Sequence, residues 1–131
     1  MNIFVTDPNP IKSAYNIDVS MRCHKMILES SQMMNLALIR HNAPDSVRPL
    51  KTDGSLFMIT NRHKNHPCTK WVGESRSNYV WLLDHAAELC NINHTKTGRM
   101  HSLARLNYDR LLMGALYIPD GPLTPFVGSI S

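Results

Sequence analysis

Two stretches of helical apolar periodicity constrain the fold of this 131-residue chain more than any other feature. The first is expected to begin at Asp18 or Ser20 and to end near Arg40. Its apolar residues recur at steps of three and four: Val19, Cys23, Met26, Ile27, Met33 or Met34, Ala37 and Leu38. The second follows the capping residue Ser75 and ends at Thr97-Gly98. One side of it carries Tyr79, Leu82, Leu83, Ala86, Leu89 and Cys90. Each stripe must be buried against another element, so the chain is predicted to be all-α.

Shorter helical segments flank these two. Asn9 is placed to cap a short helix that begins at Pro10, and Pro67 begins a helical turn that Gly73 ends. A third principal helix is expected from about Met100 to Leu112. Its inward residues would be Met100, Leu103 and Ala104.

The remaining segments are irregular. Residues 41–66 are punctuated by proline, asparagine, aspartate and glycine, which predicts a long connection with a short extended piece near Leu56–Ile59. The tail carries Pro119, Pro122 and Pro125 and is expected to lie across the helices. The prediction is one compact domain over residues 1–131, with three principal helices, short helical turns, long irregular connections and a Pro-rich C-terminal tail.

Composition narrows the class of protein. Apolar residues make up 43% of the chain and charged residues 18%, which does not suggest disorder. The longest apolar runs, such as Tyr79–Leu83, are too short to cross a bilayer. The N-terminus lacks a basic segment followed by a long apolar one, so a cytosolic protein is expected. Its odd number of widely spaced cysteines, Cys23, Cys68 and Cys90, predicts reduced and mostly buried thiols.

Positive charge is gathered in two stretches. The net charge is +4, with seven histidines in addition. Basic residues dominate 62–76 and again 96–110, and together they could form one footprint for a phosphate backbone. An ordinary solvated surface is the alternative.

One face of the first long helix combines a carboxylate with cations. Arg22, Lys25, Glu29 and Gln32 lie at helical spacing and share a side. A carboxylate framed by cations can stabilise developing positive charge or transfer a proton. The alternative from spacing alone is a surface pair between Lys25 and Glu29.

Histidines and aromatic residues give weaker signals. His63 and His66 have the spacing of metal ligands on one helical turn, but Pro67 places His66 at a helix boundary, so no metal site is expected. His66 is instead expected to contact phosphate or to cap the helix. Trp71 and Tyr79 are predicted to be core residues and not a platform for stacked bases, whereas spacing leaves Trp81 open.

Three segments resemble a known family. Its first-helix signature is similar to Lys25-Met-Ile-Leu-Glu-Ser-Ser-Gln-Met-Met34. A second block resembles Asn65-His-Pro-Cys-Thr-Lys-Trp-Val-Gly-Glu-Ser-Arg-Ser-Asn-Tyr-Val-Trp-Leu-Leu83, and a third resembles Gly98-Arg-Met-His101. The family comprises small phage proteins grouped with the pyrimidine-dimer DNA glycosylases of the endonuclease V type.

The resemblance implies a helical domain that grips a kinked duplex and moves a base out of the stack. Glu29 corresponds to the glutamate that supports glycosidic cleavage, and Arg22, seven residues earlier, to a polar residue that contacts DNA. Both are assigned to the catalytic site. No cofactor is implied. The residues assigned by extension to DNA binding are Lys25, Lys64, His66, Lys70, Arg76, Asn78, Arg99 and His101.

One position departs from the family pattern. In the glycosylase the attacking amine is the N-terminus, freed when the initiator methionine is removed before a small residue. Here Asn2 follows Met1, and a bulky second residue normally keeps the methionine. The nucleophile is therefore not identified.

Three functions follow as hypotheses. The first is a phage DNA glycosylase, with or without lyase activity, that acts on a flipped damaged or modified pyrimidine in double-stranded DNA. The second is a base-modifying transferase on the same scaffold, which needs a small-molecule co-substrate. The third is a non-catalytic module that binds nucleic acid or blocks a host factor. All three would work in the cytoplasm of an infected bacterial host, and the sequence leaves the oligomeric state open.

Overall fold

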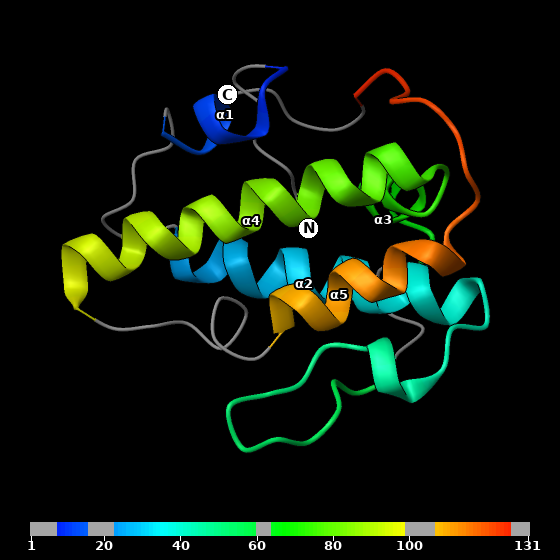
Figure 1. Cartoon of the computed structure of the whole chain (residues 1–131), viewed down its shortest axis with the longest axis horizontal. Helices are drawn as coiled ribbons and strands as arrows, with labels where there is room; N and C mark the ends of the chain where they lie inside the picture. The colour runs from blue at the N-terminus through cyan, green and yellow to red at the C-terminus, as the bar shows by residue number, and fades with distance from the viewer. Residues whose placement is uncertain (1–7, 16–22, 60–63, 99–106, 127–131) are drawn as a thin grey trace.

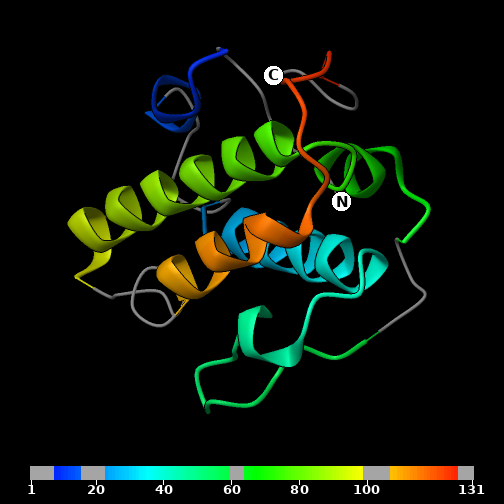
Figure 2. The ribbon, with the colours of Figure 1, turned by 45° about the vertical axis from the view of Figure 1, so that its right-hand side comes forward.

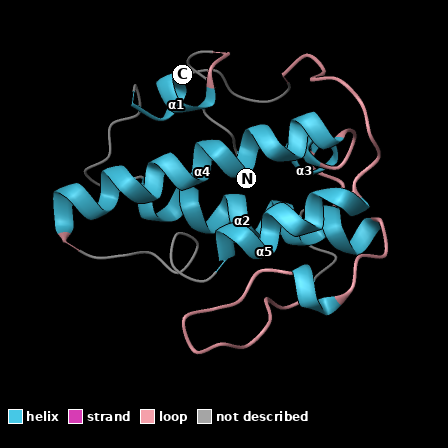
Figure 3. Ribbon diagram, viewed as in Figure 1, coloured by secondary structure: helices cyan, strands magenta, loops and turns pink. Residues whose placement is uncertain are grey.

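The structure is a computed structural model of the chain that describes residues 8–15, 23–59, 64–98 and 107–126. The α-helices are α1 (Pro10–Tyr15), α2 (Cys23–Arg40), α3 (Pro67–Val72), α4 (Arg76–Thr97) and α5 (Tyr108–Gly114). Two 3-10 turns, η1 (Asp45–Val47) and η3 (Ala115–Tyr117), accompany them. Over these ranges the chain forms no strand, as Figure 3 shows, so the predicted all-α class is confirmed.

Helix α4 is the centre of the fold. It spans the length of the molecule, with α1 on one side and α2 and α5 on the other (Figure 1). The six predicted apolar residues of its stripe are all fully buried, and so are Ile27, Met33, Met34 and Leu38 of α2. Both predicted stripes are therefore confirmed over their described residues, which form one shared core, whereas Val19 and the side chain of Cys23 lie outside the described part of the chain.

Capping residues set the helix boundaries as predicted. The Asn9 side chain accepts hydrogen bonds from the backbone N–H groups of Ile11 and Lys12, and Ser75 Oγ accepts one from Asn78 N at 3.2 Å. Gly98, at φ 73°, adopts the left-handed conformation that ends α4. The end of α2 at Arg40 is also confirmed, whereas its predicted start at Asp18 or Ser20 lies outside the described residues.

The predicted end of the last helix is wrong. The helix continues past Leu112 to Gly114 and then as η3 to Tyr117, because Leu111, Ala115 and Ile118 carry its buried side further along the chain. The inward residues predicted for its first part, Met100, Leu103 and Ala104, lie outside the described residues.

Helix α1 is fastened to α4 by two aromatic side chains. Trp81 Nε1 donates to the carbonyl of Pro8 at 2.8 Å, and His85 Nδ1 lies 3.0 Å from the carbonyl of Pro10, which can only accept. The two rings stack, and both are buried, so Trp81 is a core residue. Burial lowers the pKa of His85 below its usual range, and the bond to Pro10 offsets part of that effect.

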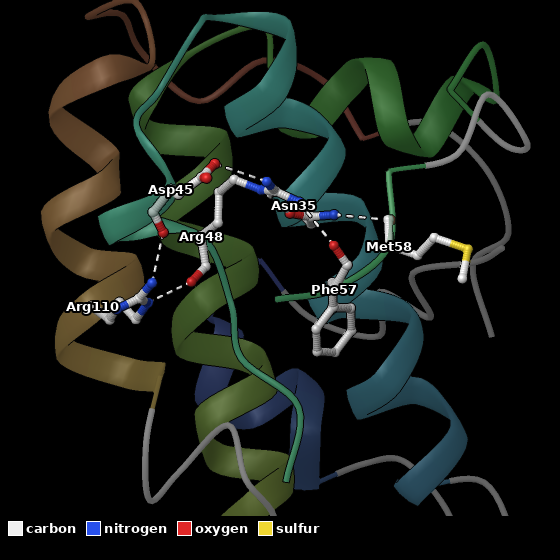
Figure 4. Close-up of polar contacts among 6 residues, drawn as sticks. All are labelled: Asn35, Asp45, Arg48, Phe57, Met58 and Arg110. Atoms are coloured by element: carbon white, nitrogen blue, oxygen red, sulfur yellow. Dashed lines mark hydrogen bonds and ion pairs between the residues drawn. The ribbon is translucent and has the colours of Figure 1, made fainter. Parts of the chain in front are cut away.

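The long connection after α2 is held by a buried arginine (Figure 4). Arg48 donates from Nε to Asn35 Oδ1 at 2.9 Å, from Nη1 to Asp45 and from Nη2 to the carbonyl of Phe57 at 2.8 Å. Arg110 of α5 donates to the carbonyls of Arg48 and Asp45. These bonds fix the connection against α2 and α5. The predicted extended piece is limited to one bridge between Leu50 and Leu56.

The C-terminal segment 119–126 crosses the start of α4 (Figure 2), as predicted for the tail. Arg76 N donates to the carbonyl of Pro119 at 2.8 Å. The hydroxyls of Ser75 and Ser77 donate to the carbonyls of Pro122 and Gly121. Cys68 and Cys90 are buried, as predicted for these thiols, and the side chain of Cys23 lies outside the described part of the chain. Within the described ranges, every helix is too short or too polar to span a membrane.

Close packing at Gly114 yields the first prediction. A Cβ at this position would lie 2.8 Å from Leu38 Cδ2 and 3.1 Å from the Tyr79 hydroxyl, both in the core. We expect Gly114→Ala to lower the free energy of unfolding by about 1–3 kcal/mol through overpacking. Denaturant unfolding monitored by circular dichroism measures this.

Gly73→Ala is the matched control. A Cβ there would meet the end of the flexible Arg40 side chain at 3.2 Å, so a much smaller change is expected. Equal destabilisation by the two substitutions would contradict the packing described for Gly114.

Candidate nucleic-acid interface

The outward side of α2 carries the carboxylate singled out by the sequence. Lys25 is exposed and Glu29 is half-buried. At 3.6 residues per turn, Glu29, Leu36 and Arg40 lie within about 20° of one line along the helix. We call Lys25, Glu29, Gln32, Leu36 and Arg40 the outer face of α2, in which Leu36 is buried at 8% exposure.

This face leads into a pocket of about 530 Å³ between α2 and α3. Its lining residues come from α2, from α3 with the adjoining Glu74, and from the chain on either side of residues 60–63. They are Leu36, Ala37, Ile39, Arg40, Ile59, Lys64, Asn65, Thr69, Lys70 and Glu74. We call this cavity the α2–α3 pocket. It combines apolar surface from α2 and Ile59 with three cationic side chains and one carboxylate.

Polar contacts to the end of α3 and to Gly73 hold the end of α2 in place. Arg40 Nη1 donates to the carbonyl of Lys70 at 3.3 Å. His41 Nε2 lies 2.7 Å from the carbonyl of Gly73, and because that carbonyl can only accept, this nitrogen carries the proton. The absence of a side chain at Gly73 leaves the space in which the Arg40 guanidinium lies. The pocket wall is therefore fixed by the packing of two helices.

The pocket brings together part of the predicted site. Lys64 and Lys70, both predicted to contact phosphate, line the same cavity. Arg40 joins them and was missed by the sequence analysis. Its helical register with Glu29, eleven residues earlier, was the signal that could have identified it.

Glu29 and Lys25 remain available on the outer face of α2. Between described residues, the structure contains no Lys25–Glu29 ion pair and no side-chain hydrogen bond from Glu29. No contact in the structure therefore supports the alternative of a surface ion pair between Lys25 and Glu29 among the described residues. The Glu29 side chain is partly exposed to solvent.

His66 has one of the two roles left open for it. Its Nδ1 accepts a hydrogen bond from Cys68 N at 3.2 Å and caps α3. The capping role is thus confirmed, and contact with phosphate stays a prediction. Trp71 and Tyr79 are buried, which confirms their assignment to the core.

Two residues assigned to DNA binding have structural roles; this overturns the assignment of Asn78, whereas DNA contact by Arg76 stays a prediction. Asn78 is fully buried, and its amide bonds the carbonyl of Trp71 and both Oγ1 and N of Thr124 at 2.8–2.9 Å. Arg76 donates from Nε to the carbonyl of Ala115 at 2.9 Å and pairs with Asp120. Both side chains face the C-terminal half of the chain. Asn78 in particular cannot reach DNA without leaving the core, so its assignment is corrected.

Three further predicted residues are not placed. Arg22, assigned to the catalytic site, and Arg99 and His101, assigned to DNA binding, lie outside the described residues.

No protein-family profile, no curated protein and no solved structure gives a significant match to this chain, so these comparisons do not show its family.

The structural role of Asn78 gives the second prediction. We expect Asn78→Ala to lower the free energy of unfolding by about 1–3 kcal/mol, because it leaves buried partners without hydrogen bonds. It should also speed amide hydrogen exchange at Thr124, whose N–H bonds Asn78 Oδ1. Hydrogen exchange measured by NMR reports both effects.

Ser77→Ala is the comparison variant, since it removes a single bond to the tail at the half-buried edge of the same helix. A loss of DNA affinity in Asn78→Ala with unchanged stability and exchange would restore the DNA-contact assignment.

Proposed function

We propose that this chain is a phage DNA glycosylase-like enzyme that acts on a flipped damaged or modified pyrimidine in double-stranded DNA. In this proposal Glu29 is the acid/base or charge-stabilising carboxylate. The resemblance of the segments around Glu29 and of residues 65–83 supplies the reaction class. The position of Glu29 on the helix that lines the cationic α2–α3 pocket supports the proposal.

The observation that carries the proposal is the alignment of Glu29 with the α2–α3 pocket. Glu29 and Leu36, which lines the pocket, are seven residues apart on one helix, or about 10 Å along its axis. Two lysines predicted from sequence as phosphate contacts line that pocket. The helix that carries the Glu29 carboxylate therefore also forms one wall of the pocket that these cations line.

The charges suit a phosphate backbone. Arg40, Lys64 and Lys70 face the pocket against the single carboxylate of Glu74, so the cavity has net positive charge. Cations that neutralise phosphates release counterions from DNA and supply most of the sequence-independent affinity. Binding through these residues would leave the Glu29 end of the outer face for a base and its sugar.

Glu29 has the chemistry required at that end. As a glycosidic bond breaks, positive charge develops on the sugar, and a nearby carboxylate stabilises it. The same group can take a proton from an attacking water or amine. Its half-buried position lowers its contact with water without enclosing it, so a flipped nucleotide can approach.

The size of the pocket favours a second candidate function. At about 530 Å³ it falls within the range of small-molecule sites and exceeds what one phosphate fills. A base-modifying transferase would hold its co-substrate there and use Glu29 as general base on a DNA pyrimidine. The two candidates share Glu29 and differ in whether the glycosidic bond is cut.

Glu29→Gln provides the third prediction. The amide keeps the shape of the side chain but cannot accept a proton or carry negative charge. We expect the rate of base release from ultraviolet-irradiated or phage-modified duplex DNA to fall by at least about a hundredfold. DNA affinity, measured by fluorescence anisotropy, should change little.

Glu88→Gln on α4 is the control, because Glu88 is a half-buried glutamate distant in sequence from the outer face of α2. No base release by the wild-type protein, with DNA gaining mass from a small donor, would assign the transferase. Activity that survives Glu29→Gln would overturn the catalytic role, and an absence of both activities would leave a binding module.

A further inference from the structure

Two consecutive large apolar residues, Met58 and Ile59, are exposed where the chain reaches the α2–α3 pocket. Met58 is 74% exposed and Ile59 is 62% exposed, the former being the most exposed large apolar residue in the described part of the chain. Ile59 is also part of the pocket lining. Large apolar side chains exposed next to each other in the sequence are an informative feature of a protein surface.

The backbone that carries this pair is fixed to the helices. The carbonyl of Met58 accepts from Asn35 Nδ2 of α2 at 3.5 Å, and the carbonyl of Phe57 accepts from the buried Arg48 at 2.8 Å. Phe57 itself is buried and is bonded to Pro49 through its N–H. Figure 4 shows the Met58 side chain directed away from Arg48 and Asn35. The backbone of Phe57 and Met58 is thus held by hydrogen bonds, and the Met58 side chain projects from it.

The positive charge of the pocket limits which partners can bind Met58 and Ile59. Arg40, Lys64 and Lys70 line the same pocket as Ile59, so a partner that covers Ile59 must also accept positive charge. A nucleic-acid duplex offers both surfaces, with phosphates outside and apolar base faces between its steps. Proteins that kink DNA insert side chains such as Met and Ile between base steps.

We infer that Met58 and Ile59 form an apolar wedge that enters the base stack of bound duplex DNA while Arg40, Lys64 and Lys70 hold the backbone. This inference rests on the proposed DNA binding. It adds a positioning role: the wedge unstacks the step beside the target nucleotide and so lowers the cost of moving that nucleotide toward Glu29.

The test uses the full chain and a duplex that contains 2-aminopurine next to a tetrahydrofuran abasic analogue, which cannot be turned over. The fluorescence of 2-aminopurine rises when the base is unstacked. Wild-type protein should bind and raise the fluorescence. Met58→Ala/Ile59→Ala should still bind with the same salt dependence but lose at least about four-fifths of that rise, because the cations remain and the wedge is gone.

The matched control removes exposed apolar surface elsewhere. Leu112→Ala/Met113→Ala on α5 alters two side chains that are exposed on another element, and it should keep the full fluorescence rise. Thermal unfolding of both double variants should match the wild type, since all four side chains are exposed.

Each other outcome decides against the wedge. Tight binding by the wild type without a fluorescence rise, or an unchanged rise in Met58→Ala/Ile59→Ala, would overturn the wedge and leave DNA binding intact. No binding of duplex at all would overturn the proposed function itself. Concentration-dependent self-association that Met58→Ala/Ile59→Ala abolishes would assign the pair to contact with a second copy of the chain.

Discussion

The buried guanidinium of Arg48 is the interaction on which the arrangement of the long connection depends. Arg48 is only 5% exposed and lies among side-chain and backbone oxygens from three places in the chain. A buried charge is tolerated when its donors are satisfied, and the donors at Nε, Nη1 and Nη2 all find acceptors. The connection is therefore held in one path although its sequence contains little regular structure.

The path of this connection fixes two other parts of the molecule, the approach to the α2–α3 pocket and helix α5. Asn35, which accepts from Arg48, also donates to the carbonyl of Met58, so the same α2 residue fixes the approach to the α2–α3 pocket. Arg110 uses its charge on the carbonyls of Arg48 and Asp45 and ties α5 to the connection. Arg48 and Arg110 are thus engaged in hydrogen bonds within the fold. Among the described cations, Lys25 and Arg40 lie on the outer face of α2, and Arg40, Lys64 and Lys70 line the pocket.

The fold was more predictable from sequence than the site. The stripes of α2 and α4 could be read directly, because helical periodicity records which side is buried. The end of α5 could not, since its inward residues Leu111, Ala115 and Ile118 cross from an α-helix into a 3-10 turn. Capping by Asn9 and Ser75 could be predicted because Asn and Ser are strongly preferred at the position just before a helix.

Residue type could not separate the ligand-facing polar residues from the structural ones. Asn78 and Arg76 lie in the second block of the family resemblance, yet they bind the C-terminal part of the chain. Their partners there lie far along the sequence, so no local pattern could reveal these bonds. Arg40 was missed for the same reason, because its neighbours in the pocket come from α3 and from the chain around residues 59 and 64.

The central claim is that the cations of the α2–α3 pocket grip a DNA backbone, and its most direct test is the salt dependence of duplex binding. Lys64→Gln/Lys70→Gln should reduce the slope of log affinity against log salt concentration by about two, because each lysine neutralises one phosphate. Lys12→Gln/Lys51→Gln, which neutralises two exposed lysines outside the pocket lining, should leave the slope unchanged. Equal slopes for the wild type and the Lys64→Gln/Lys70→Gln variant would contradict the account.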